Sequence, residues 1–148
     1  MAPDSPIPSW ENSLTPERRA LDFVDFAVDQ VEQLAPLLPY GYGLDGVVRA
    51  AFMESFMVNV RLLVEFLTFD LDPKDRRARD FVPGFASQDT AAVARLKDAW
   101  TLASRHVMHL SKDRTPDLDD LEHVTAEQIQ RMARDCRAVY DEFRAQLA

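Results

Sequence analysis

The sequence predicts an all-α domain, and three observations support this prediction. Apolar residues recur at alternating spacings of three and four, and no segment shows the strict alternation of a half-buried strand. Only four glycines interrupt the 148 residues. A content of 47% hydrophobic and 28% charged residues is typical of a globular chain with one core. We therefore expect an up-down four-helix bundle with a long connection between the second and third helices.

The first helix is expected to begin after residue 14. Three prolines interrupt residues 1–14, which lack periodicity and are predicted to form a flexible N-terminal arm before a helical domain spanning 15–148. Thr15 is suited to cap the helix, Pro16 to occupy its first position and Glu17 to complement its dipole. The helix is predicted to reach about residue 38, with this core face: Leu21, Val24, Val28, Val31, Ala35 and Leu38.

The second helix is predicted from residue 45 to about 69. A segment containing Pro and Gly, 39–43, breaks the first helix, and Asp45 is a good N-cap residue. Apolar residues cover far more of this helix than the ~100° stripe of a surface helix, so we expect it to be central or shared with a partner. Residues 70–88 form the long connection, with a short helical turn predicted at 76–81.

The third helix is predicted to start near residues 87–89 and to run to about 110. Its expected core side consists of Leu96, Trp100, Ala103, Val107 and Leu110. The fourth helix opens with a capping-box pattern at Thr125 and Gln128. Its expected core face consists of Ile129, Met132, Cys136, Val139 and Phe143.

Composition argues against several classes of function. A net charge of −8 repels phosphate backbones, so DNA binding is not expected and any RNA contact needs a local basic patch. Four charged residues interrupt the most apolar run, 47–69, so we expect no membrane-spanning helix. The single cysteine excludes an internal disulfide, and no secretory signal is recognisable, which favours the cytoplasm. No phosphate-binding loop, zinc-type Cys pair or His-Glu-x-x-His motif is present, so no cofactor is expected.

A polar cluster occupies the end of the third helix and the residues after it. Arg105 and His109 are four residues apart and project together away from the core side, with His106 at the edge. Lys112 and Arg114 follow. One interpretation is a solvated helix end whose cations offset the negative end of the dipole. The other is a functional cluster in which histidine moves a proton and arginine holds phosphate.

A polar line on the second helix is the other candidate binding feature. Glu54, Arg61 and Glu65 lie within about 40° on a helical wheel, and Arg61 and Glu65 are spaced to form an ion pair. This line is either an exposed, ion-paired stripe or a surface that a partner helix covers. Asn59 points closer to the core side, where a buried amide needs partners, and His106 is one candidate.

Three segments together resemble a group of small uncharacterised bacterial proteins: FMESFMVNVRLLVEFL (52–67), DFVPGF (80–85) and SRHVMHLSKDR (104–114). The sequence is also similar to the wider HEPN superfamily of four-helix bundles, whose members often dimerise and include RNases of toxin and antiphage systems. This resemblance implies that Arg105 and His109 correspond to the Arg and His of the HEPN motif. Three residues separate them here, fewer than in the active pattern, and His106 stands where Asn or Asp is common.

We therefore expect a non-catalytic, HEPN-like binding or regulatory module of a defence or stress-response system. The alternative is a metal-independent RNase in which His109 acts as general acid or base, Arg105 stabilises phosphate charge and Arg114 positions the backbone. A second alternative is a metal-binding bundle that combines His106 and His109 with His123 or a carboxylate, although spacing fixes no third ligand.

A homodimer through the second and third helices is also expected. It would cover the surplus apolar surface of the second helix and of Leu102, which is predicted to be exposed beside His106. Two copies of the Arg105/His109 cluster would then face each other. RNA or a partner protein is the expected ligand.

Overall fold

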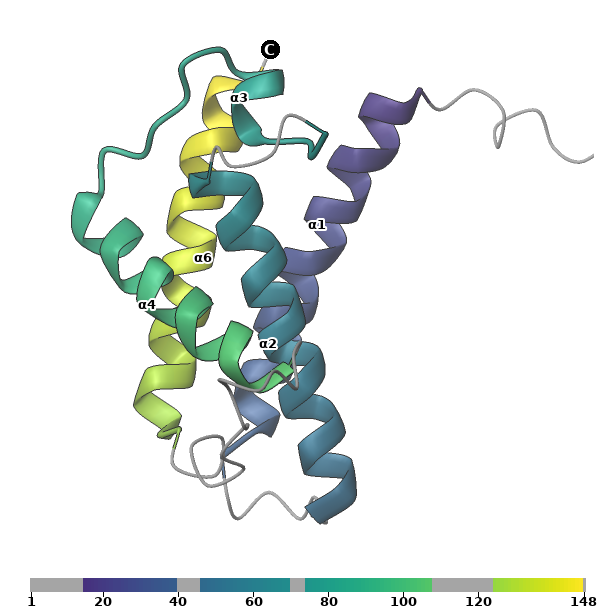
Figure 1. Ribbon diagram of the computed structural model, residues 1–148, viewed down its shortest axis with the longest axis vertical. Coiled ribbons are helices and arrows are strands. Elements are labelled where there is room, and N and C mark those ends of the chain that lie inside the picture. Colours follow the sequence, from purple (N-terminus) through teal and green to yellow (C-terminus); the bar gives the residue numbers. More distant parts are fainter. Residues whose placement is uncertain (1–14, 40–45, 70–73, 108–123, 148) are drawn as a thin grey trace, which may run out of the picture.

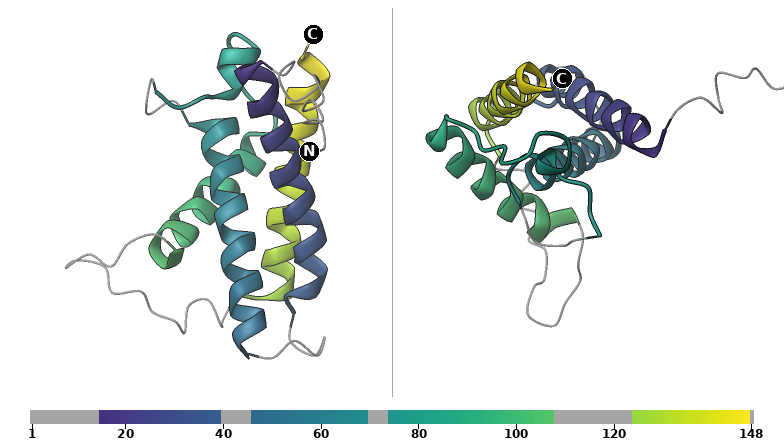
Figure 2. Two further views of the ribbon diagram at one scale, coloured as in Figure 1. Left: turned by 90° about the vertical axis from the view of Figure 1, so that its right-hand side faces the viewer. Right: turned by 90° about the horizontal axis from the view of Figure 1, so that it is seen from above.

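The computed structural model describes residues 15–39, 46–69, 74–107 and 124–147, and these residues form helices and no strand. The elements are α1 (Pro16–Leu34), η1 (Ala35–Leu37), α2 (Gly46–Thr68), α3 (Ala78–Phe81), α4 (Thr90–Val107) and α6 (Ala126–Gln146). The prediction of an all-α chain is confirmed. Successive long helices alternate in direction, and α4 runs obliquely across α2 and α6 (Figures 1 and 2).

Side-chain caps fix the starts of two helices as predicted. The Thr15 hydroxyl accepts a hydrogen bond from the Arg18 amide at 3.2 Å at the start of α1. At the start of α6, Thr125 and Gln128 each accept from the backbone amide of the other, at 3.1 and 2.8 Å. These bonds satisfy amides that have no partner inside the helix, so the chain enters each helix at a defined residue.

The first α-helix is shorter than predicted. It ends at Leu34, and a 3-10 turn carries the chain through residues 35–37. Pro36 explains the change, because proline lacks the amide hydrogen of an α-helix and its ring crowds the carbonyl four residues earlier. Leu38 is nevertheless buried, and its carbonyl accepts a hydrogen bond from the buried Arg49 side chain of α2 at 2.8 Å.

The second helix is the centre of the fold. α1, α4 and α6 all pack against α2, which explains within one chain why its apolar residues extend around so much of its circumference. Exposed large apolar side chains on α2 are confined to Val47, Val48 and Val58. Among the helices that the structure describes, none has both the length and the apolar content to cross a bilayer.

The long connection contributes to the core. The Phe143 ring of α6 is fully buried, with its centroid 5.3 Å from that of Phe66 and 5.6 Å from that of Phe85 in edge-on contacts. Beyond this ring cluster, the Ser87 hydroxyl donates a 2.6 Å hydrogen bond to the Glu142 carboxylate. The segment that follows α3 is therefore held against α6 by aromatic packing and by a polar contact.

Candidate functional site

The described chain contains only part of the predicted catalytic cluster. Arg105 is exposed near the end of α4. His106 belongs to the same helix, but its side chain is not among those described. The other members of the cluster lie outside the described residues, as does the predicted metal ligand His123: His109, Lys112 and Arg114. The convergence of Arg105, His109 and Arg114 therefore stays a prediction.

Two residues of the polar line on α2, Arg61 and Glu65, contact α4 of the same chain. Arg61 Nε lies 3.1 Å from Glu65 Oε1, and this oxygen also accepts a 2.9 Å hydrogen bond from Trp100 Nε1. The Arg61 guanidinium carbon lies 5.8 Å from the centroid of the Trp100 ring, within the range of cation–π contacts. Arg61 and Glu65 therefore bind α4 rather than forming a freely exposed stripe.

The other two binding residues predicted on α2 differ in exposure. Asn59 is half-buried, and its Nδ2 donates a 2.8 Å hydrogen bond to the Ser55 carbonyl one turn earlier. This intrahelical contact supplies a partner for the amide, for which the sequence had suggested His106. Glu54 is exposed on the outer surface of α2.

A groove of about 250 Å³ lies between α4 and α6 and was not predicted from the sequence. Ala99 and Met132 are buried at its floor. Leu102, which was predicted to be exposed, is half-buried in this groove because α6 packs beside it. Exposed polar side chains form the rim: Arg95, Asp98, Gln128 and Arg131. We call this feature the α4–α6 groove.

A two-point ion pair joins the two helices at the groove. Arg95 Nε and Nη2 donate to Asp135 Oδ2 and Oδ1, each at 2.9 Å. Asp135 is only 6% exposed, and a buried carboxylate is tolerated where a partner of this geometry neutralises it. The hydrogen bonds and the charge of Asp135 raise the pKa of Arg95 above its ordinary value. The pair therefore fixes one wall of the groove.

The cysteine beside this pair is chemically inert. Cys136 is 1% exposed, and burial, together with the charge of Asp135, raises the pKa of its thiol to about 12. Because the thiolate is the reactive form, Cys136 is protonated and unreactive at neutral pH. Within the described part of the chain, no group of three or more His, Cys, Asp or Glu side chains is placed to hold a metal ion.

Arg105 does not line the groove, but it lies further along α4. Asp98, Leu102 and Arg105 follow one another at spacings of four and three, which places them along one face of α4. His106 stands four residues after Leu102 in the same helix. Of the predicted cluster, Arg105 therefore lies one turn of α4 beyond Leu102, which lines the groove.

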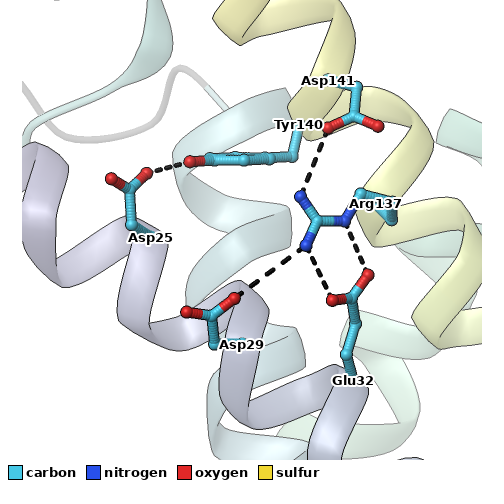
Figure 3. Close-up of polar contacts among 6 residues, drawn as sticks. All are labelled: Asp25, Asp29, Glu32, Arg137, Tyr140 and Asp141. Atoms are coloured by element: carbon cyan, nitrogen blue, oxygen red, sulfur yellow. Dashed lines mark hydrogen bonds and ion pairs between the residues drawn. The ribbon is translucent and has the colours of Figure 1, made fainter.

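A second polar network joins α1 to α6 (Figure 3). Arg137 Nε and Nη2 lie 2.6 and 2.7 Å from the two carboxylate oxygens of Glu32, and its Nη1 lies 3.3 Å from Asp141. The Tyr140 hydroxyl donates to the Asp25 carboxylate. The hydrogen bonds from Arg137 lower the pKa of Glu32. These groups bind each other, so we assign the network to holding α1 against α6.

Of the two polar contacts between helices, only the Arg95–Asp135 pair had a signal in the sequence. Asp135 stands three residues after Met132 and four before Val139, so it interrupts the apolar series of α6 with a carboxylate. A charged residue at such a position indicates a buried partner. Arg137 and Glu32 had no comparable signal, because they are 105 residues apart and pair only through the packing of two helices.

No protein-family model matches the chain, and no significant match occurs among curated proteins or among solved structures. The HEPN resemblance therefore stays a prediction, and the candidate site rests on the geometry of the α4–α6 groove.

Proposed function

We propose that the protein is a non-catalytic, HEPN-like binding module that presents the α4–α6 groove to a partner protein in the cytoplasm. It is an up-down four-helix bundle, and it acts in a defence or stress-response system. The groove carries this proposal, because it combines an apolar floor with a rim of both charges. Such an arrangement is typical of the centre of an interaction surface, where apolar anchors are desolvated and polar groups confer specificity.

The pairing of the charged groups supports binding rather than catalysis. Arg95 is held by Asp135, and Arg131 Nη2 lies 2.9 Å from Glu127 Oε1 on the same helix. An arginine does not release its proton near neutral pH, so it cannot act as a general base. The buried Cys136 thiol is also protonated, because burial raises its pKa to about 12. The arginines therefore supply charge for binding a partner, and neither they nor Cys136 supplies a general base or a nucleophile.

The size of the groove indicates what it binds. Its volume of about 250 Å³ is below the ~300–1,000 Å³ that is common for small-molecule pockets. The groove therefore fits an apolar side chain of a partner protein better than a whole cofactor. Aspartate and arginine on the rim would then pair with charged residues that flank this anchor.

A photocrosslinking experiment tests this proposal. A photoreactive amino acid is placed at Arg131, which lines the groove, or at Arg134, an exposed residue of α6 outside it. We expect a specific crosslinked product in cells from position 131 and not from position 134, and we expect Leu102→Glu to suppress it. Equal products from both positions, or none from either, would contradict the groove as a binding surface.

Self-association is a separate proposal, which the oligomeric state of the purified protein tests. We retain the proposal of a homodimer through α2 and α4, supported by the exposed Val58 of α2 and the half-buried Leu102 of α4. Light scattering at micromolar protein is expected to give twice the chain mass of 16.9 kDa. A single-chain mass that does not change with concentration would exclude a stable dimer.

Incubation of the purified protein with mixed RNAs tests the catalytic alternatives. The proposed module leaves RNA intact with or without chelator. Cleavage that persists in chelator and disappears in His109→Ala would establish the metal-independent RNase with Arg105 and Arg114 as partners. Cleavage that chelator abolishes would instead favour the metal-binding alternative.

A further inference from the structure

A second cavity, of about 300 Å³, is lined by residues of α1, α2 and the segment before α3. α1 contributes Phe23, α2 contributes Leu62 and Phe66, and the segment before α3 contributes Arg76 and Arg77. Phe23 is 56% exposed, which is unusual for a large aromatic side chain on a helix of the core. The cavity therefore has an apolar part between α1 and α2 and a charged part before α3, where Asp75 lines it together with the two arginines.

Arg77 is a buried cation whose hydrogen-bonding capacity is incompletely used. The residue is only 7% exposed, yet it lines the cavity, and its Nε has no hydrogen-bond partner. Its Nη2 lies 3.1 Å from Asp75 Oδ2, and the Asp75 side chain is 56% exposed. A buried donor without an acceptor is costly, so an anion that replaces or joins Asp75 would lower the free energy of this site.

Arg76 supplies a second, more accessible cation. Its Nη1 lies 3.5 Å from Glu17 Oε1, and both side chains are about half exposed, so this ion pair contributes little and exchanges readily. Glu65 also lines the cavity, but its Oε1 already accepts from Trp100 and Arg61. Each of the two arginines is therefore paired with one exposed carboxylate, Asp75 or Glu17, that a ligand can displace.

We propose that this α1–α2 cavity binds a small organic anion with an apolar body, such as an alkyl carboxylate. Its carboxylate pairs with Arg76 and Arg77, and its chain packs between Phe23 and the apolar side chains of α2. Arginine suits this role because its planar fork matches a carboxylate. The volume lies at the lower end of the small-molecule range, which excludes a helix as occupant.

The overall charge of −8 does not prevent anion binding at this site. At physiological ionic strength, charges more than about 8 Å apart are largely screened. Within the cavity, Arg76 and Arg77 are balanced by Glu65 and Asp75, so the ligand binds by displacing the exposed carboxylates of Asp75 and Glu17 from the two arginines. This proposal rests on the α1–α2 cavity alone and is independent of the partner proposed for the α4–α6 groove.

Titration calorimetry with octanoate tests the proposal, and 1-octanol serves as the uncharged control of equal chain length. We expect saturable binding of octanoate and binding of octanol that is about tenfold weaker or more, as for the loss of one charge-assisted hydrogen bond. Arg76→Gln is expected to weaken octanoate binding by a similar factor. Equal affinity for the two ligands, or no saturable binding of octanoate, would overturn the proposal.

Two matched variants of α1 locate the binding site. Phe23→Ser is expected to abolish octanoate binding, whereas Phe26→Ser is expected to weaken it less, because Phe26 is similarly exposed at 54% and contacts the Phe23 ring but does not line the cavity itself. Arg18→Gln, which changes an exposed arginine of α1 outside the cavity, is the control for Arg76→Gln. Circular dichroism verifies that each variant is folded. Equal losses in Phe23→Ser and Phe26→Ser would refute this location.

Discussion

Replacing Phe143 by alanine is expected to lower the free energy of unfolding by roughly 3–5 kcal/mol, the range for a buried phenylalanine. The side chain is 0% exposed, and three rings lie around it, those of Phe66, Phe81 and Phe85, at 5.3, 6.4 and 5.6 Å between centroids. Each edge-on pair contributes about 0.5–1.5 kcal/mol beyond area burial. Removing the Phe143 ring leaves a cavity between three rings. These rings belong to α2, to α3 and to the connection after α3, so they cannot all move inward to fill it.

Urea unfolding and thermal unfolding, both followed by far-UV circular dichroism, measure this loss. A chain of this length shifts its melting temperature by about 2–4 °C per kcal/mol, so we expect a decrease of roughly 6–20 °C. Phe26→Ala is the control, because its exposed ring is expected to contribute less than about 1 kcal/mol. A loss below about 1 kcal/mol for Phe143→Ala would refute the inference that the connection after α3 is part of the core.

Three further predictions concern the buried thiol of Cys136 and two polar contacts between helices. Because burial raises the pKa of the Cys136 thiol to about 12, the native protein is expected to resist Ellman's reagent at pH 8 until it unfolds; rapid labelling would contradict this. Arg137 lowers the pKa of Glu32 below its ordinary value of 4.5, so the pair stabilises the fold above that pH and loses this effect as pH falls through the lowered pKa. Urea titrations should therefore show that Arg137→Gln costs stability at pH 7 and less at pH 3; an undiminished difference at pH 3 would contradict the pairing. A double-mutant cycle of Trp100→Phe and Glu65→Ala should give a coupling of about 1 kcal/mol, and additive effects would show that their hydrogen bond contributes nothing.

The sequence alone determined where most helices begin and which faces are buried. The caps at Thr15 and Thr125 and the apolar series of α6 depend on residues within one or two turns, so a local pattern is sufficient to predict them. The same local reasoning placed Arg105 on the polar side of α4, where the structure finds it exposed. The early end of α1 also had a local cause, Pro36, which the periodicity obscured.

Tertiary packing decided which of these faces meet, and therefore where the candidate sites lie. Arg95 and Asp135 are 40 residues apart, and their pairing depends on how α4 is rotated and inclined against α6. Arg61 and Glu65 of the polar line of α2 are half-buried because Trp100 of α4 packs against them, a contact that no periodicity specifies. Helical spacing fixes the direction of a side chain relative to its own helix axis, whereas a groove between helices depends on the positions of two axes.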